Sequence, residues 1–404
     1  MRGDSASEND QTPEEGHSPK LLRPADLPDN FTRSLYKIAP YRGCGHGCRY
    51  CDGRAERYYV PGDFERDIEI RRTVPDRLER ELPRIRERGM IGFGSGVTDP
   101  YQPIETVEEL TGRCASILAT SPQPLPAMVM TKSSLPMRDL PAWSRLNERA
   151  GFILLVSITS LDETLRERME PGASCFASRI ETLRAFKKAG CATGALVMPL
   201  LPGLSDNTES IQRVYSACID AGVDFIMPGG LTLRPGRQKA CYAEALAQFY
   251  PDQVGLTHDL YHEERQSGMP TRQAGRALYI KTKQIQQDHN IPFLLPHKIY
   301  ANFLPHHDGL RILFRDMVEL YSERGIDTEP LMQSSERYDN WLVSLRRVFR
   351  RRRSLPNEWL EERLFQALRS NELAKVLSNS KLAAFVSSIL TDGVRLNYVS
   401  LKLE

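Results

Sequence analysis

The stretch YRGCGHGCRYC, residues 41–51, places Cys44, Cys48 and Cys51 within eight residues of one another. Its three glycines allow the backbone to wrap closely around a bulky centre. Thiolates are soft ligands that suit iron–sulfur clusters or zinc, and three so close together are too dense for ordinary core packing. The stretch is therefore interpreted as a metal-binding loop.

Three cysteine ligands on a [4Fe-4S] cluster leave one iron open to a small molecule, such as the amine and carboxylate of S-adenosylmethionine (SAM). An electron passed to the sulfonium then releases a 5'-deoxyadenosyl radical, which the protein must position and shield. Two other interpretations stay open: a structural cluster without SAM, and a zinc ion held by the cysteines with His46 or a more distant histidine. Zinc sites usually pair two CxxC-like knuckles, and the sequence has no second one.

Short apolar runs alternate with amphipathic segments, which predicts β/α units around a parallel sheet. We expect strands at KIAPY before the cysteines, MIGFGSG near 90, AMVMTKS near 127, FILLVSITS near 152, ATGALVMPLLPG near 192 and VDFIMPGG near 223, with IPFLLP near 291 as a weaker candidate. Helices are expected at 76–88, 105–120, 177–189 and 208–221, with Gly89, Gly190 and Gly222 placed as C-terminal caps. The predicted fold class is α/β, a partial (β/α)6 barrel whose chemistry lies at the carboxyl ends of the strands.

The pattern divides the 404-residue chain into three parts. Residues 1–30 are polar and poor in aromatics, which predicts a disordered tail. Residues 31–300 form the partial barrel. Residues 301–404 form a helical C-terminal appendage, with helices expected at 308–323, 335–353, 356–370 and 372–390.

The spacing CxxxCxxC, with Tyr50 just before the last cysteine, resembles the signature of the radical SAM superfamily. Further phrases resemble its spore photoproduct lyase-like branch, which includes DNA repair photolyase-like proteins: PYRGC (40–44), TDPYQPIE (98–105), TKS (131–133), SIT (157–159), EPG (170–172) and PLLPGLSD (199–206). The resemblance implies a radical SAM enzyme, lyase-like, that abstracts hydrogen from an unknown substrate, with DNA or another nucleic acid as a candidate. It also implies a reductant such as flavodoxin or ferredoxin as a partner.

By the same resemblance, Tyr50 approaches the adenine of SAM, and Ser95, Lys132 and Ser157 serve its methionyl and ribose ends. A lysine cation suits a carboxylate, and a serine hydroxyl suits ribose or carboxylate oxygens. Each is equally well explained as an ordinary polar residue at a strand end. No side chain is assigned to the hydrogen transfer itself.

Other residues near the strand ends have two interpretations each. Asp99 either orders SAM or substrate, or caps the next helix. Arg168 and Glu170, in RMEPG, either form a structural ion pair or line the cavity. Pro199 and Pro202 are expected to shape the exit of the fifth strand.

One departure from the branch concerns a thiol. Spore photoproduct lyases carry a hydrogen-donating cysteine beside a TSD-like triplet after the second strand, whereas residues 96–99 here read GVTD. Thymine-dimer repair therefore does not follow from the resemblance. The five scattered cysteines are expected to be small buried apolar residues: Cys114, Cys175, Cys191, Cys218 and Cys241.

Residues 346–353 read RRVFRRRR, the densest basic run in a chain with 54 basic and 52 acidic residues. The run either contacts phosphates or forms a solvated helix face. Phosphate contacts would also suit a non-enzymatic, zinc- or cluster-stabilised nucleic-acid-binding protein. The phrase PHHD, residues 305–308, is expected to be a loop rather than a metal site.

The sequence contains no signal-like start and no run of about 18 apolar residues. We therefore expect a cytoplasmic protein with no membrane association.

Overall fold

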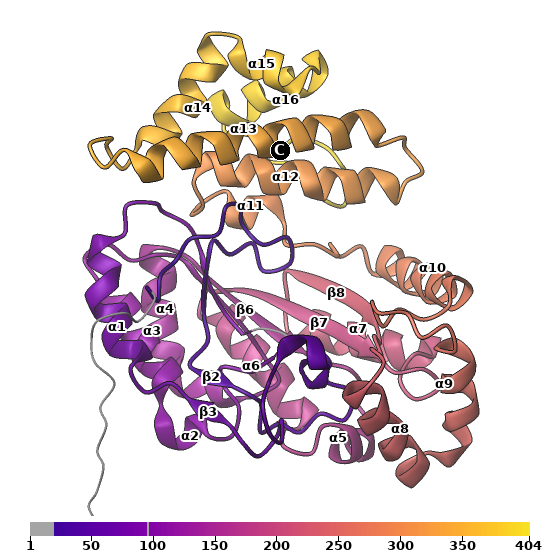
Figure 1. Cartoon of the computed structure of the whole chain (residues 1–404). Helices are drawn as coiled ribbons and strands as arrows, with labels where there is room; N and C mark the ends of the chain where they lie inside the picture. Colours follow the sequence, from indigo (N-terminus) through magenta and orange to yellow (C-terminus); the bar gives the residue numbers. More distant parts are fainter. Residues whose placement is uncertain (1–19, 95–96) are drawn as a thin grey trace, which may run out of the picture.

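The computed structural model describes residues 20–94 and 97–404, and its centre is a six-stranded parallel sheet (Figure 1). The order across the sheet is β1 (Tyr36–Ile38), β4 (Ile91–Phe93), β5 (Ala127–Thr131), β6 (Phe152–Ser157), β7 (Ala192–Leu200) and β8 (Phe225–Gly230). β1 and β8 form the two edges, so the sheet is open. The predicted α/β class and partial barrel are confirmed.

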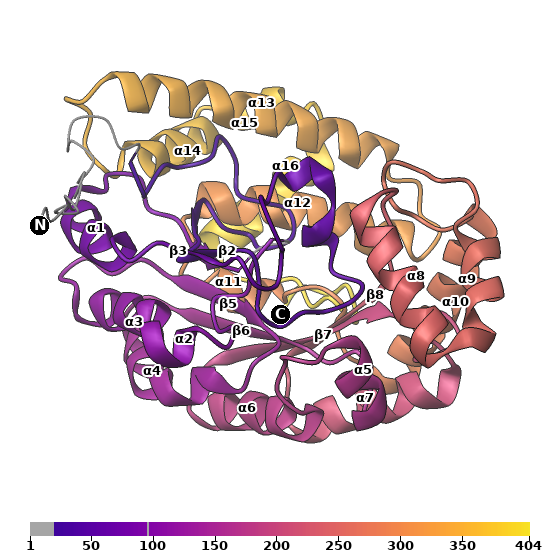
Figure 2. The same ribbon diagram turned by 60° about the horizontal axis from the view of Figure 1, so that its bottom comes forward.

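Helices cover the outer face of the sheet, and Figure 2 shows several of them along one side of it. They are α1 (Val74–Glu81), α3 (Leu110–Thr120), α4 (Leu140–Arg149), α6 (Phe176–Lys188) and α7 (Thr208–Asp220). Alternate strand residues such as Leu154 and Val156 pack against them in one large core cluster. All six residues of β6 are buried, because a parallel strand covered on both faces reads as a continuous apolar run.

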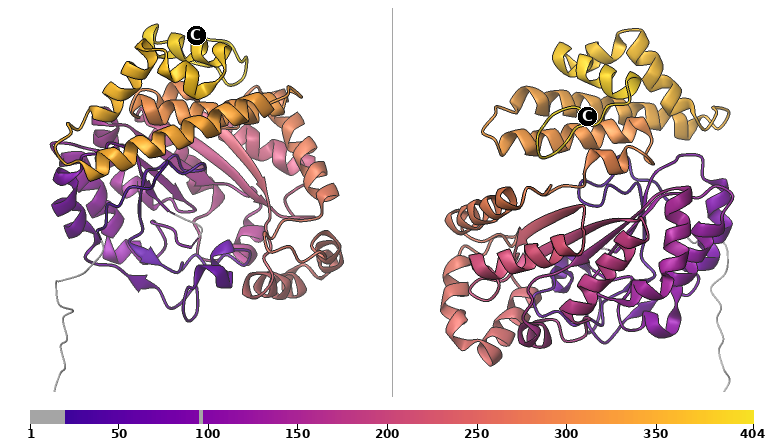
Figure 3. Two further views of the ribbon diagram at one scale, coloured as in Figure 1. Left: turned by 45° about the horizontal axis from the view of Figure 1, so that its top comes forward. Right: turned by 180° about the vertical axis from the view of Figure 1, so that it is seen from behind.

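The opposite face of the sheet packs against the C-terminal helices, which stand as a separate layer in Figure 3. Ile153 and Leu155 of β6 share a core cluster there with Leu313 and Leu342. The layer contains α11 (His297–Tyr300), α12 (His306–Ser322), α13 (Glu329–Arg351), α14 (Trp359–Arg369), α15 (Glu372–Leu377) and α16 (Ser380–Thr391). The helical C-terminal region is therefore confirmed.

The loops at the carboxyl ends of the strands carry the remaining elements. A short antiparallel pair, β2 (Tyr41–Arg42) with β3 (Glu69–Ile70), closes the segment that contains the three cysteines. Helices α2 (Glu105–Glu108) and α5 (Glu163–Met169) follow β4 and β6. Helices α8 (Arg237–Phe249), α9 (Val254–Leu260) and α10 (Arg272–His289) follow β8.

Several predicted element boundaries are wrong. The helix expected at 76–88 ends at Glu81, two residues before Pro83, so Gly89 does not cap it. The helix expected at 105–120 is divided at Glu109, whose φ is 51°. The segment 372–390 forms two helices, and IPFLLP near 291 is not a strand. Gly190 and Gly222 do have the positive φ typical of residues that end helices.

Residues 20–30 are part of the folded unit, so the predicted tail is too long at this end. Leu22 is buried, and the backbone N–H groups of Leu21 and Leu22 donate to the Glu81 carboxylate at 3.0 and 2.9 Å. Residues 1–19 lie outside the described residues.

The basic run is partly used inside the protein. Arg346 is fully buried, and its guanidinium lies 2.6 Å from Glu87 Oε1 and 2.7 Å from Asp308 Oδ1. Arg350 lies 2.9 Å from Glu87 Oε2. These two arginines therefore join the helical region to the barrel and do not form a free phosphate-binding surface.

The phrase PHHD begins α12 rather than forming a loop. His306 and His307 each place Nδ1 against the Glu361 carboxylate, at 3.0 and 2.6 Å. Across the part of the chain that the structure describes, no helix has the length and apolarity needed to cross a membrane.

Candidate functional site

The three cysteines lie in a tightly folded loop between β2 and β3. Cys44 and Cys48 are buried, and Cys51 is half-buried. Gly43 and Gly47 have φ of 85° and 62°, and a Cβ on them would lie 3.0 Å from Phe64 O and 2.9 Å from Glu65 Oε2. A side chain at either position would therefore adopt a strained backbone conformation, and at Gly43 it would also press on a backbone carbonyl, in line with the glycine-rich loop expected from the sequence.

One side of the cysteine loop is held by the phrase that follows β4. Gln102 accepts from the Gly45 N–H through Oε1 at 2.7 Å and donates through Nε2 to Gly43 O at 3.1 Å. The Thr98 hydroxyl donates to the same carbonyl at 2.9 Å. These side chains are buried, and a hydrogen bond is stronger in such low-dielectric surroundings than in water, so they fix the loop.

The other side is held by Gly172 of the EPG phrase. The Gly172 N–H donates to His46 O at 2.9 Å, and the Gly172 carbonyl lies 2.9 Å from His46 Nδ1. His46 Nε2 lies 3.1 Å from Asp99 Oδ2. His46 Nδ1 thus faces a carbonyl, whereas Nε2 lies beside the Asp99 carboxylate without a hydrogen bond to any described residue.

Asp99 connects the cysteine loop to the end of β5. Its carboxylate accepts from the Thr131 hydroxyl at 2.7 Å and from the Lys132 backbone N–H at 2.8 Å. Burial would raise the pKa of Asp99, but His46 and these donors outweigh it and hold the pKa below its ordinary value. Helix α2 begins after Ile104, so Asp99 does not cap it.

Tyr50 belongs to a buried polar network behind the loop. Its hydroxyl donates to Glu170, whose carboxylate also accepts from Thr159 at 3.0 Å and pairs with Arg179. Burial would raise the pKa of Glu170, but Arg179, Lys132 and Tyr50 hold it at about 2. The ion pair considered for Arg168 and Glu170 is therefore formed with Arg179 instead.

Arg168 has a different environment. Its guanidinium lies 5.8 and 5.2 Å from the ring centres of Phe249 and Tyr250. This stacking ties α5 to the end of α8, away from Glu170.

The three cysteines open onto one cavity of about 440 Å³ at the carboxyl ends of the strands. Its lining is Phe31, Cys44, His46, Cys48, Tyr50, Cys51, Asp52, Thr98, Asp99, Met130, Thr131, Lys132, Ser157, Leu196, Met198, Pro199, Gly230, Leu231 and Thr232. Tyr50, Lys132 and Ser157 are thus brought together with the cysteines. Ser95 lies outside the described residues.

Lys132 and Ser157 present polar groups to this cavity. The Lys132 ammonium lies 5.8 Å from the centre of the Tyr50 ring. Within residues 20–94 and 97–404 it forms no ion pair, and the Ser157 hydroxyl has no hydrogen-bond partner. A cation and a hydroxyl are therefore available to a bound molecule.

The chemistry of the cysteines fits a metal centre. Burial raises the pKa of all three thiols, and the charges of the neighbouring cysteines raise that of Cys44 further. Metal binding replaces the thiol protons, so a cationic centre offsets the free-energy cost of deprotonating these buried thiols.

Sites for a single metal ion are a separate question. In the described part of the chain, no three His, Cys, Asp or Glu side chains are close enough to share a single ion.

The remaining cysteines lie elsewhere. Cys114, Cys191 and Cys218 are buried, as predicted, whereas Cys175 and Cys241 are half-buried. Among the described residues, the cavity is lined by no cysteine besides the three of the loop.

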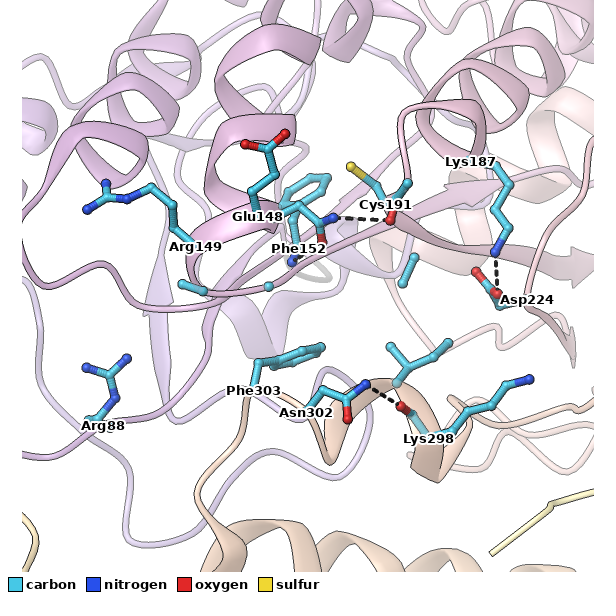
Figure 4. Close-up of a pocket in the computed structure, with 16 residues that line it drawn as sticks. Arg88, Glu148, Arg149, Phe152, Lys187, Cys191, Asp224, Lys298, Asn302 and Phe303 are labelled. Atoms are coloured by element: carbon cyan, nitrogen blue, oxygen red, sulfur yellow. Dashed lines mark hydrogen bonds and ion pairs between the residues drawn. The ribbon is translucent and has the colours of Figure 1, made fainter. Parts of the chain in front are cut away.

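A larger cavity of about 780 Å³ lies at the amino ends of the strands, between the start of β6 and α11 (Figure 4). Its polar groups are largely engaged: Lys187 lies 2.6 Å from Asp224, and Asn147 donates to Gly190 O at 3.1 Å. The functional site is assigned to the smaller cavity because the cysteines and the strand-end polar groups meet there.

Comparison with known proteins gives the class. A model described as the Radical SAM superfamily matches residues 38–214. The uncharacterized protein Rv2578c of Mycobacterium tuberculosis is 31% identical over 247 residues, covering 60% of this chain and 70% of that protein. The uncharacterized protein ORF301 of Acidianus two-tailed virus is 28% identical over 196 residues, covering 46% and 63%. A solved spore photoproduct lyase variant, with bound AdoMet and dinucleoside spore photoproduct, aligns with a TM-score of 0.49 and 16% identity, covering 66% of this chain and 78% of that one.

The open parallel sheet and the CxxxCxxC loop at its carboxyl edge define an α/β protein of the radical SAM type. The chain belongs to the radical SAM superfamily. Membership implies a [4Fe-4S] cluster and SAM as cofactors.

Sequence reasoning missed the residues that hold the cysteine loop. Gln102 lies within the TDPYQPIE phrase, and its amide, which can both accept and donate a hydrogen bond, is the signal that could have identified it. Arg179 gave no local signal, since it lies on α6, nine residues beyond its partner Glu170. Gln238 of α8 donates to Tyr50 O at 2.9 Å from even farther along the chain.

Proposed function

We propose that this protein is a radical SAM enzyme that binds a [4Fe-4S] cluster on Cys44, Cys48 and Cys51 and uses it to cleave SAM and abstract a hydrogen atom from a substrate. The observation that carries the proposal is the opening of the three cysteines of the loop onto one cavity beside Lys132 and Ser157. A protein that binds a metal for structure alone has no need of such a cavity beside it.

The cysteine loop would hold the cluster through its three thiolates. When bound, the cluster supplies the electron that cleaves SAM to a 5'-deoxyadenosyl radical. The loop is fixed from both sides by Gln102 and Gly172, so its ligands are held in place before the metal arrives. Such preorganisation lowers the cost of binding.

The polar groups at the strand ends would bind SAM. The Lys132 ammonium suits the methionyl carboxylate, and the Ser157 hydroxyl suits a ribose or carboxylate oxygen. Tyr50 would contact the adenine, with its ring fixed because its hydroxyl is bound to Glu170. The apolar side chains of Met130, Leu196 and Met198 would exclude water from the reacting end of SAM.

A metal analysis of anaerobically purified and reconstituted protein tests the cluster. We expect about four irons and four acid-labile sulfides per chain. Loading should be lost in a Cys44→Ala, Cys48→Ala, Cys51→Ala triple variant, and retained in the matched control Cys114→Ala, Cys191→Ala, Cys218→Ala, whose cysteines are also buried but lie in the core. About one zinc per chain with no sulfide would contradict the proposal and support the zinc-stabilised alternative.

A nucleic-acid substrate is the second candidate, and four arginines of the basic run support it. Arg347, Arg351, Arg352 and Arg353 are exposed near the end of α13, whereas Arg346 and Arg350 are engaged in ion pairs. If the four bind phosphates, replacing them by Ala should weaken oligonucleotide binding and reduce its salt dependence by about 0.9 in log–log slope for each phosphate that is no longer neutralised. The control replaces four exposed basic residues elsewhere: Arg80, Lys188, Arg213 and Arg272. Equal effects of the two sets would exclude a specific role for the run.

A further inference from the structure

A second cavity of about 480 Å³ adjoins the cysteine cavity. The two share Phe31, Gly230 and Leu231 as lining residues, so these residues form the wall between them. The second cavity lies between the turn before β1, the end of β8, and helices α10 and α12. Figure 1 shows α10 beside the β8 edge of the open sheet. We call this second cavity the side chamber.

The side chamber is mostly apolar. Its lining includes Met227, Met269, Leu278, Phe293 and Leu294. Methionine side chains adapt to the shape of an apolar ligand, and Gly275 leaves open space beside the backbone, since a Cβ on it would meet no atom within 4 Å. Met269 is 49% exposed and Phe31 is 38% exposed, so apolar surface is accessible on both sides of the chamber.

The charged side chains that line the chamber are Arg33, Lys283, Glu319 and Glu323. The Arg33 guanidinium is paired with the buried Asp316, whereas Lys283, whose ammonium donates to the backbone carbonyl of Glu323, forms no ion pair with any residue that the structure describes. Glu319 and Glu323 form none either, so beyond the Arg33–Asp316 pair the chamber carries two carboxylates and one ammonium, a net negative charge. Glu319 is exposed, so its charge faces the solvent side of the chamber.

We propose that the side chamber binds the part of the substrate that does not react, and that this part is an uncharged apolar group followed by a cationic group. The inference rests on the proposed function, because it assumes that the substrate reacts in the adjoining cysteine cavity. The apolar group fills the chamber between β8 and α10, and the cation meets Glu319 and Glu323. The substrate passes from the chamber toward SAM beside Phe31, Gly230 and Leu231, which line both cavities.

Gly275 provides a direct test of the chamber. It lines the cavity from α10, its φ is not positive, and a Cβ placed on it meets no atom within 4 Å. A Gly275→Trp variant should therefore fill the chamber without disturbing the helix. Gly255→Trp is the matched control, because Gly255 also lies on a helix, α9, with no atom within 4 Å of its Cβ, but does not line the chamber.

The probe is N-phenyl-1-naphthylamine, a neutral apolar dye that becomes fluorescent in apolar sites. We expect saturable binding of one dye per chain, weakened at least about tenfold by Gly275→Trp and unchanged by Gly255→Trp. Absent binding, or equal binding by the two variants, would overturn the proposal.

Displacement of the dye tests the charge. Octylamine and octanoate have the same chain length and opposite charges at pH 7. Octylamine should displace the dye at about a threefold lower concentration, and Glu319→Gln should reduce this advantage. Displacement by octanoate or by a dinucleoside phosphate at a concentration as low as that of octylamine would overturn the cationic assignment.

The two proposals fail differently. Cluster-loaded protein that binds the dye but does not cleave SAM contradicts the proposed function. Protein that cleaves SAM but does not bind the dye in the chamber contradicts only the present inference.

Discussion

Gly172 is the position where a single methyl group should most directly disturb the cysteine loop. A Cβ on Gly172 would lie 2.4 Å from Gly45 O and 3.0 Å from His46 Cα, whereas ordinary contacts begin near 3.4 Å. The loop backbone would have to move by about 1 Å, because backbone atoms cannot rotate away as a side chain does. Such overpacking costs about 1–3 kcal/mol. It also weakens the two hydrogen bonds between Gly172 and His46.

A cost of about 1–3 kcal/mol lowers the population of the loop conformation that can bind the cluster about 5- to 150-fold. We therefore expect Gly172→Ala to take up far less iron than wild type during anaerobic reconstitution with limiting iron and sulfide. The measurement is iron and sulfide per chain, with the electron paramagnetic resonance spectrum of the reduced protein. Gly255→Ala is the control, since its added methyl group meets nothing within 4 Å. If Gly172→Ala loaded as fully as wild type and gave the same spectrum, the loop would not be held in the way described.

Three further results are expected. Arg346→Met should destabilise the protein by about 3–5 kcal/mol in urea unfolding, because it leaves Asp308 buried without its arginine and Glu87 paired with Arg350 alone. Arg351→Met, on the exposed end of α13, should change stability by less than about 0.5 kcal/mol. Glu361→Gln should destabilise the protein most between pH 4.5 and 6.5. Although burial alone would raise it, the histidines lower the pKa of Glu361 from 4.5 to about 2, so the stability that the Glu361 charge contributes is lost as pH falls from 4.5 toward 2. The hydrogen bond to Glu361 raises the pKa of His306 above 6.5, so the stability that protonated His306 contributes is lost as pH rises through that raised pKa. The difference from wild type should be about 1–2 kcal/mol at pH 5.5 and smaller at pH 8.5, and a difference independent of pH would contradict the ion pair. Lys132→Met should raise the dissociation constant of SAM about 10- to 100-fold in calorimetry. Ser157→Ala should raise it less, because a hydrogen bond from a charged donor is stronger than one from a neutral hydroxyl. Equal effects of the two substitutions would argue against the contact between Lys132 and the SAM carboxylate.

Local patterns predicted the framework of this fold well. The continuous apolar run FILLVS is the buried strand β6, and the alternation of such runs with amphipathic segments predicted a parallel sheet built from β/α units. The cysteine spacing predicted the loop, and its glycines predicted the tight backbone. These features depend on neighbouring residues, so a single sequence is enough to find them.

Contacts between distant residues were not predictable in the same way. The basic run was expected either to contact phosphates or to form a solvated helix face, yet Arg346 is buried against Glu87, which lies 259 residues earlier. Likewise, Arg168 was the nearer candidate partner for Glu170, but the fold brings Arg179 to it. Which charges meet depends on how α6 and α13 pack, and no periodicity in the sequence reports that.

The central claim is that the protein cleaves SAM by one-electron chemistry at the cysteine loop. The most direct test is to incubate the anaerobically reconstituted protein with SAM and dithionite and to measure 5'-deoxyadenosine and methionine by liquid chromatography. We predict that both form in equal amounts with the wild-type protein and that neither forms with the Cys44→Ala, Cys48→Ala, Cys51→Ala variant. A fully loaded wild-type protein that yields no 5'-deoxyadenosine would contradict the claim.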